Sequence, residues 1–215
     1  MKPVFVFDAY GTLFDVASPV RRHTEAIGPL SDRLAELWRL KQLEYTWVRS
    51  MCGAYQDFEV LTADSLDFSM ASLGLKNETL RSNLLDAYKF PACYQEVPAA
   101  LAALKSSGVK TAILSNGTPA MLQAAVTAAE IGQYFDAILS VDRVKIFKTS
   151  PQAYRLVTSH FGCAPADVSF HSSNRWDIAG AAAFGFHTVW VNRRRAPNEY
   201  EGLGPDREIS DLSQL

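Results

Sequence analysis

The sequence has few cysteines, no long apolar run and no excess of either charge, and each absence excludes a class of protein. Its three cysteines, Cys52, Cys93 and Cys163, include no C-x-x-C pair, which excludes a disulfide framework and indicates a reduced protein of the cytosol. No apolar stretch approaches the ~18 residues of a membrane-spanning helix. The four apolar residues before Asp8 are too few for a signal peptide, so we expect a cytoplasmic protein without a membrane partner.

The charge is almost balanced, with 21 Lys and Arg against 23 Asp and Glu. This balance gives no electrostatic reason to expect nucleic acid as a partner. One basic run, Arg193, Arg194 and Arg195, follows a strand-like segment and is expected to be a solvated loop. The four histidines show no metal-ligand spacing, and a G-x-S-x-G nucleophile motif is absent.

Strand-like and helical segments alternate over most of the 215 residues. Apolar runs predict strands at 4–7, 110–115, 137–140, 168–171 and 188–191, the last of these being the final strand. Helical periodicity lies between them, at 97–107, 119–130, 151–161 and 176–184. This alternation predicts an α/β fold with a doubly wound parallel sheet, a Rossmann-like core.

The segment from about residue 19 to 88 is different, because it has helical periodicity and no convincing strand. Helix starts are indicated at Ser31, at residues 62–64 and at Asn77. We therefore expect a four-helix insert. The domain prediction is a core made of residues 1–14 and 93–215, with residues 15–92 as a helical cap.

Polar side chains follow several of the predicted strands. They are Asp8 after the first, Ser115 and Asn116 after the second, and Ser172 and Asn174 after a later one, with Lys148 and Asp177 close to helix starts. Each has an ordinary explanation as a helix cap, a turn residue or a surface charge, and turn capping by Asp8 is an equal alternative. Parallel strands, however, bring their carboxyl ends to one edge, where open α/β sheets bind ligands. Together the residues predict a site.

These residue types support nucleophilic chemistry on an anionic substrate. A carboxylate can attack an electrophilic carbon or phosphorus and form a covalent intermediate. A nearby lysine keeps the carboxylate ionised and neutralises an anion. Ser, Asn and the N–H groups at helix N-termini donate hydrogen bonds to that anion.

The order of these motifs resembles that of the haloacid dehalogenase superfamily: Asp-x-x-Gly-Thr at residues 8–12, then Ser115-Asn116-Gly117, Lys148 and Asp177. Most of its members are magnesium-dependent phosphatases with a second Asp two positions after the nucleophile. Tyr10 stands there in this chain. Half of the usual metal site and one proton donor are thus missing, and we expect no metal and no cofactor.

Three longer strings resemble the L-2-haloacid dehalogenase branch: FDAYGTLFD at 7–15, LWRLKQLEYTW at 37–47 and SSNRWD at 172–177. The resemblance implies hydrolysis of short (S)-2-haloalkanoic acids to (R)-2-hydroxy acids, with inversion. Asp8 attacks C2 of the substrate, halide leaves, and water hydrolyses the aspartyl ester. The expected partners are a 2-haloacid, a halide ion and a second copy of the chain.

The resemblance also implies roles for individual residues. Asp8 is the nucleophile, Lys148 its cationic partner, and Asp177 the base that activates water. The other four catalytic residues position these groups: Thr12, Tyr154, Ser172 and Asn174. Ser115, with backbone amides near Tyr10 and Asn116, holds the substrate carboxylate. The halide pocket consists of Arg39, Asn116, Phe58 and Trp176.

His171 and Leu43 are candidate specificity residues. His171 stands where the family pattern has an apolar residue such as Val. Its ring is either hydrogen-bonded within the sheet, or it crowds the halide site and tunes Asp177.

Two other functions stay open on the sequence. The first is a magnesium-dependent phosphatase of the same fold, and the second is a catalytically silent protein that binds ligands in the same cleft.

Overall fold

A six-stranded parallel sheet lies at the centre of the computed structural model, which describes residues 3–215. The strands stand in the order β5 (Ala137–Ser140), β4 (Lys110–Ser115), β1 (Val4–Phe7), β6 (Val168–Ser172), β7 (His187–Val191) and β8 (Arg207–Ile209). Every neighbouring pair is parallel. The predicted doubly wound α/β fold is confirmed.

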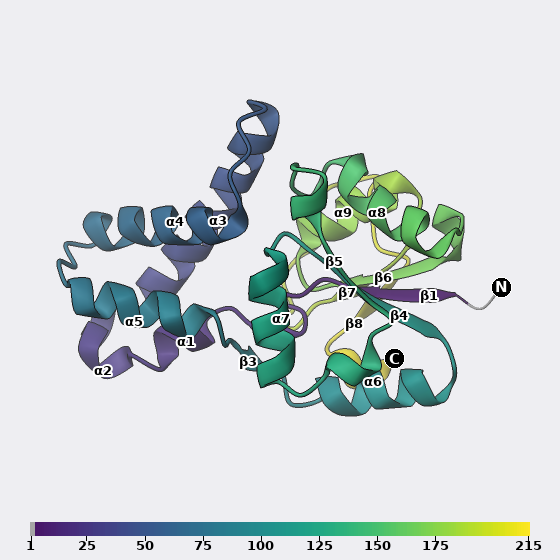
Figure 1. Cartoon of the computed structure of the whole chain (residues 1–215), viewed down its shortest axis with the longest axis horizontal. Coiled ribbons are helices and arrows are strands. Elements are labelled where there is room, and N and C mark those ends of the chain that lie inside the picture. Colours follow the sequence, from purple (N-terminus) through teal and green to yellow (C-terminus); the bar gives the residue numbers. More distant parts are fainter. Residues whose placement is uncertain (1–2) are drawn as a thin grey trace.

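Helices cover both faces of this sheet. They are α6 (Val97–Ser106), α7 (Pro119–Ala128), α8 (Pro151–Phe161) and α9 (Arg175–Phe184). Figure 1 shows α8 and α9 on one face and α6 on the other. Because both faces are covered, β1 reads as an apolar run rather than an alternation, and Val6 and Phe7 are fully buried. The predicted strands and helices of this part are confirmed to within one or two residues.

One strand was not expected. The prediction that residues 188–191 are the final strand is wrong, because β8 pairs with β7 in parallel, with Val189 opposite Arg207. β8 has three residues, and Ile209 is the buried one among them. So short a segment carries no apolar alternation, and only its pairing with β7 makes it a strand.

Five α-helices lie together beside the sheet (Figure 1). They are α1 (Ser18–Arg21), α2 (Thr24–Ile27), α3 (Ser31–Met51), α4 (Phe58–Ser72) and α5 (Glu78–Tyr88). The expectation of four helices is wrong, since three are long and two have a single turn. The starts at Ser31 and after Asn77 are confirmed. The start at 62–64 is wrong, because Asp57 caps α4 by accepting a hydrogen bond from Val60 N.

A short two-stranded ribbon carries the chain into and out of these helices. β2 (Phe14–Asp15) pairs antiparallel with β3 (Ala92–Cys93), and the sequence predicted neither strand. The ribbon lies at the two boundaries expected for the cap. Five short 3₁₀ segments complete the described elements: Gly28–Leu30, Gly132–Tyr134, Val141–Arg143, Pro165–Asp167 and Leu212–Gln214.

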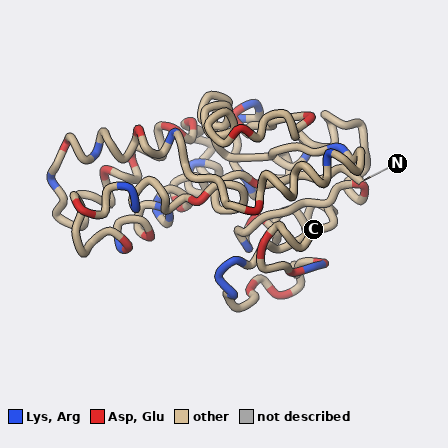
Figure 2. Tube along the Cα trace, turned by 90° about the horizontal axis from the view of Figure 1, so that it is seen from below, with Lys and Arg blue, Asp and Glu red and all other residues tan. Residues whose placement is uncertain are grey.

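The helices beside the sheet and the sheet itself share one hydrophobic cluster. Trp38 and Leu61 belong to it from α3 and α4, and Val6 and Leu114 from the strands. Within residues 3–215, no helix has the length and apolar character needed to cross a bilayer. Figure 2 shows basic and acidic residues interspersed along the chain, as its balanced composition suggests.

Candidate active site

Asp8 follows β1 directly and lies at the carboxyl edge of the sheet. Backbone bonds close the turn after it, because Thr12 N, Leu13 N and Phe14 N all donate to the carbonyl of Ala9. The Asp8 carboxylate takes no part in these bonds and accepts from side chains instead, so it does not cap the turn. Asp8 is 5% exposed, and a carboxylate so buried needs partners.

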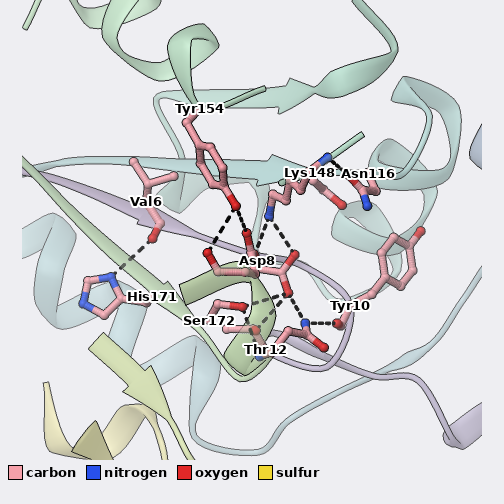
Figure 3. A network of polar contacts seen from close by, with 12 residues as sticks. Val6, Asp8, Tyr10, Thr12, Asn116, Lys148, Tyr154, His171 and Ser172 are labelled. Carbon is pink, nitrogen blue, oxygen red and sulfur yellow. Dashed lines mark hydrogen bonds and ion pairs between the residues drawn. The ribbon is translucent and has the colours of Figure 1, made fainter. Parts of the chain in front are cut away.

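Four side chains supply these partners, and Figure 3 labels three of them, Lys148, Thr12 and Ser172. Lys148 Nζ donates to Asp8 Oδ1 at 3.0 Å. Oδ2 accepts from Asn174 Nδ2 at 2.7 Å, Thr12 Oγ1 at 3.1 Å and Ser172 Oγ at 3.5 Å. The carboxylate is thereby fixed in orientation, with one ammonium group beside it.

Lys148 is shared between two carboxylates. Its Nζ also donates to Asp177 Oδ2 at 2.8 Å, and the other oxygen of Asp177 accepts from the hydroxyl of Tyr154 at 2.8 Å. A Cβ on Gly180, one turn after Asp177 in α9, would collide with that hydroxyl. The glycine therefore lets Tyr154 approach Asp177 closely. Lys148, Asp177 and Tyr154 are all at most 1% exposed.

Burial and charge change the pKa values of this cluster. Burial raises the pKa of Asp177 to about 6, with the charge of Asp8 acting in the same direction and Lys148 in the opposite one. Burial alone would lower the pKa of Lys148, but Asp177 and Asp8 together outweigh it, and the net shift is upward. Burial and Asp177 raise the pKa of Tyr154 well above its usual value. Lys148 is thus a cation and Tyr154 a neutral donor at pH 7.

Asn174 connects the nucleophile with the helices beside the sheet. Its Nδ2 donates to Asp8, while its Oδ1 accepts from Arg39 Nη2 at 3.4 Å. The same Nη2 donates to the carbonyl of Tyr10 at 3.2 Å. Arg39 lies on α3, so this helix brings a cation to the polar edge of the sheet. The structure therefore brings Arg39 and Asp8 to the same cluster, as the sequence predicts.

Gln42 belongs to this network, although the sequence analysis gave it no role. Its Oε1 accepts from Arg39 Nη1 at 3.0 Å and from the hydroxyl of Tyr88 at 3.1 Å, and its Nε2 donates to Thr62 Oγ1 at 2.7 Å. One feature of the sequence could have indicated this role of Gln42. Gln42 lies three and four residues after Arg39 and Trp38, on the helix face that packs inward.

Tyr10 and Phe58 form an apolar wall beside these polar groups. The Tyr10 ring lies 5.6 Å from that of Tyr88 and 5.8 Å from that of Phe58, centre to centre. A Cβ on Gly117 would stand 2.9 Å from the Tyr10 ring, so the ring needs a glycine there. Burial raises the pKa of Tyr10 well above its usual value. The second acidic position of the superfamily is thus a neutral phenol.

Ser115 and Asn116 lie at the end of β4. Ser115 Oγ accepts from Gly117 N at 3.2 Å, and Asn116 Oδ1 accepts from Lys148 N at 3.0 Å. Asn116 therefore fixes the loop that presents Lys148, a contact the sequence did not predict. The expected contact between Asn116 and a halide beside Arg39 stays a prediction.

Trp176 and Leu43 are two further residues that the sequence assigned to the site. The Trp176 ring lies edge-on to that of Trp47, with centres 5.8 Å apart. Both rings line a cavity of about 640 Å³ that also includes Phe147 and Lys148. Leu43 is buried on α3. A role of either residue in the halide pocket or in specificity stays a prediction.

The ring of His171 lies inside the sheet. It stacks on Phe7 and Phe5, with ring centres 4.8 and 5.4 Å away, and its nitrogens contact Val6 O and Ser169 Oγ. These are the contacts of a histidine held within the sheet, and among residues 3–215 it has none with Asp177 or Arg39. Burial lowers the pKa of His171 to about 4, so the ring is neutral at pH 7.

The residues at the nucleophile do not fit a magnesium ion. Lys148 Nζ already bonds one oxygen of Asp8 and one of Asp177, at 3.0 and 2.8 Å, and Tyr10 adds no third carboxylate beside them. Within the described part of the chain, no group of three His, Cys, Asp or Glu side chains could hold a metal ion. The arrangement instead supports covalent catalysis, with a carboxylate held beside a lysine and amide donors.

Comparisons with known proteins agree with this chemistry. A family model described as haloacid dehalogenase-like hydrolase matches residues 2–185. The (S)-2-haloacid dehalogenase 1 of Pseudomonas sp. (strain CBS-3) is 45% identical over 98% of this chain and 93% of its own length. The (S)-2-haloacid dehalogenase 4A of Burkholderia cepacia is 42% identical over 98% of this chain and 91% of its own.

The similarity extends to the three-dimensional structure. The L-2-haloacid dehalogenase of Xanthobacter autotrophicus with chloropropionic acid covalently bound superposes with a TM-score of 0.91 at 36% identity, covering 100% of this chain and 96% of that one. Order of motifs, fold and sequence identity over nearly the full length thus agree. The chain belongs to the haloacid dehalogenase-like hydrolases, in the branch of the (S)-2-haloacid dehalogenases.

Proposed function

We propose that this chain hydrolyses short (S)-2-haloalkanoic acids to (R)-2-hydroxy acids and halide, with Asp8 as the nucleophile. One observation carries the proposal. The Asp8 carboxylate is buried and oriented by Lys148, Thr12 and Asn174, while Tyr10 stands at the position where the phosphatases of the superfamily carry a second acid. The relative from Xanthobacter autotrophicus, which has chloropropionic acid covalently bound, supports a covalent route.

The first step is a displacement at carbon. An oxygen of Asp8 forms a bond to C2 as the carbon–halogen bond breaks, and the halide leaves with the bonding electrons. Attack from the side opposite the halide inverts C2, which converts an (S) acid to an (R) product. Lys148 is paired with Asp8 before the attack, and it stays paired with Asp177 once Asp8 has become a neutral ester.

The second step hydrolyses the ester. Water attacks the carbonyl carbon of the Asp8 ester, and its proton passes to Asp177, directly or through Lys148. The tetrahedral intermediate then releases the oxygen on C2, which takes up a proton to give the 2-hydroxy acid. Tyr154 and Lys148 orient the Asp177 carboxylate for this role. The net reaction consumes one water and yields a halide ion and a proton.

The proposed substrate pocket lies between the sheet edge and α3. Arg39 receives the leaving halide, because it is the cation that α3 brings next to Asn174 and the Tyr10 carbonyl. Tyr10, Phe58 and Trp176 form apolar walls that leave the halide only partly desolvated. Ser115 and the backbone amides at Tyr10 and Asn116 bind the substrate carboxylate.

The direct test measures halide release from the two enantiomers of 2-chloropropionate in the presence of EDTA. We expect chloride and (R)-lactate from the (S) enantiomer and no turnover of the (R) enantiomer. The matched control, Asp8→Asn, should lower turnover by a factor on the order of 10⁴ or more, as loss of a nucleophile does elsewhere. Magnesium-dependent phosphate release would instead favour a phosphatase, and binding without turnover a silent binding protein.

The proposal includes the organisation of the chain. We assign residues 1–14 and 93–215 to the catalytic core and 15–92 to a cap that supplies Arg39 and excludes water. The β2–β3 ribbon at residues 14–15 and 92–93 supports this division. We also propose a homodimer in the cytosol. The three cysteines are free thiols, as a reducing compartment requires. Light scattering at defined concentration tests the dimer.

A further inference from the structure

Arg193 does not lie in solvent as the sequence led us to expect. It follows β7 and Asn192, whose side chain binds Glu208 Oε1 at 2.7 Å and both backbone groups of Ala196. The loop is therefore fixed at its base. The Arg193 side chain is 15% exposed. Its two neighbours, Arg194 and Arg195, are exposed, so the prediction of a solvated run holds for them and is wrong for Arg193.

The guanidinium of Arg193 contacts three parts of the molecule. Nη2 donates to the carbonyl of Thr12 at 2.8 Å and forms an ion pair with Glu96 Oε1 at 2.6 Å. The guanidinium also lies over the ring of Tyr94, 3.8 Å from its centre. An arginine can combine these contacts because its plane stacks on a ring while its edge donates.

These contacts join the two chain segments at one end of the β2–β3 ribbon, where β2 begins and β3 ends. Thr12 stands two residues before β2, and Tyr94 follows β3 directly. Tyr94 N donates to the carbonyl of Leu13 at 3.0 Å, so the two segments are also bonded to each other. Arg193 thus lies across the base of the ribbon that leads to α1–α5.

Thr12, whose carbonyl accepts from Arg193, also contacts the nucleophile. Thr12 Oγ1 donates to Asp8 Oδ2 at 3.1 Å and accepts from Ser173 N at 2.8 Å. The position of this hydroxyl depends on the backbone of Thr12, whose carbonyl accepts a hydrogen bond from Arg193. A charged donor to a buried carbonyl is stronger than a neutral one, so a fixed orientation results.

We propose that Arg193 is a positioning residue for the Asp8 nucleophile. It holds the Thr12 peptide against the base of the ribbon, and this keeps the Thr12 hydroxyl on Asp8 Oδ2. The inference rests on the proposed dehalogenation for its effect on rate. Its effect on the backbone of the loop and the ribbon is independent of any substrate.

The kinetic test compares R193Q with R194Q, which removes the exposed neighbouring charge. With folded enzyme in excess over (S)-2-chloropropionate and at saturating concentration, the single-turnover rate constant for chloride release does not depend on the amount of folded enzyme. We expect R193Q to lower it about tenfold or more, since small displacements of reacting groups have effects up to about 10². R193K should recover part of the loss, and R194Q should stay within about twofold of wild type. The KM values should change little.

The second readout is hydrogen exchange of the free protein, followed by mass spectrometry. In R193Q the peptides covering residues 10–15 and 92–97 should exchange faster, while R194Q leaves them unchanged. If R193Q does not fold, R193K carries both measurements, with intermediate effects expected. If the rate constants and hydrogen exchange of R193Q equal those of R194Q, the inference is overturned. Wild type without dehalogenase activity refutes the proposed reaction, and exchange then decides on Arg193 alone.

Discussion

Ser172 and His171 are neighbours on β6, yet they belong to two buried regions that treat charge in opposite ways. Ser172 contacts Asp8, which shares Lys148 with Asp177, and these three charged groups are each at most 5% exposed. His171 lies among Phe5, Phe7 and the strand backbone, and burial keeps its ring neutral. In the first region the buried charges are stabilised by ion pairs with one another. In the second region the buried titratable group, His171, is uncharged at pH 7.

The difference between the two regions shows that the buried charges available for chemistry are those of the Asp8, Lys148 and Asp177 cluster. A paired charge can still do chemistry, since a carboxylate attacks through its negative charge and Lys148 lies beside Asp8 as its counter-charge. A neutral histidine stacked on Phe5 and Phe7 adds packing and no charge. Each region can be disturbed separately, which gives four predictions in order of decreasing effect.

Lys148→Met should have the largest effect on stability. It leaves Asp8 and Asp177 buried without a counter-charge, and removing one partner of a buried pair costs about 3–5 kcal/mol. Losing Lys148 removes the charge that lowers the pKa of Asp177, so that pKa rises further, and the destabilisation should be greatest at neutral pH and shrink as the pH falls towards 5. Urea unfolding at several pH values measures this.

The control for this variant is Lys145→Met, which removes a lysine from an exposed pair with Asp142. Its effect should stay below about 1 kcal/mol. Equal losses in the two variants would contradict the idea that burial makes the Lys148 pair important.

His171 should make the protein sensitive to acid. Its pKa is about 4 in the folded state against 6.5 in the unfolded chain, so the unfolded state binds more protons between these values. Stability is then complete above pH 6.5 and falls as the pH drops towards 4, by about 2 kcal/mol at pH 5. His171→Val should remove that dependence, and His187→Gln, a change at an exposed position of β7, should not. Unfolding free energies at pH 7.5 and 5 compare the three proteins.

Asp177 should set the acid limb of the rate of ester hydrolysis. Its pKa is raised to about 6, and the base must be ionised, so the rate should fall below pH 6 and be about tenfold lower at pH 5. Asp177→Asn should lower the rate and abolish this limb. Rapid-quench decay of the Asp8 ester gives the rate, and a profile that is flat from pH 7 to 5 would argue against Asp177 as the base.

The smallest effect is expected on halide preference. Because the His171 ring contacts Phe5, Phe7, Val6 and Ser169, we expect His171→Val to change the ratio of fluoroacetate to chloroacetate turnover by less than about twofold. A larger change would restore His171 as a specificity residue.

The sequence predicts the core and the nucleophile cluster better than the cap, for a physical reason. Strands buried on both faces are apolar runs that end in polar residues, and the ends of β1, β4 and β6 could be read directly. α4 begins at Phe58, although Thr62 looks like a cap. Thr62 Oγ1 instead bonds Phe58 O and Gln42, a partner on another helix that the local sequence does not show.

The parts that were missed depend on partners distant in the chain. β8 is a strand because β7 lies beside it. Gln42 and Arg193 look like ordinary polar residues, and their roles follow from contacts with Tyr88 and Thr12, 46 and 181 residues away. Tyr10 was informative because its position in the motif is one where most of the superfamily has an acid.

The most direct test of the central claim is the mass of the peptide that contains Asp8, taken from Asp177→Asn protein quenched during turnover of (S)-2-chloropropionate. Slowing ester hydrolysis should let the intermediate accumulate. We expect a mass increase equal to the propionate group without chlorine, located on Asp8 and absent with the (R) enantiomer. Chloride release at the wild-type rate with an unmodified Asp8 peptide would contradict the covalent mechanism.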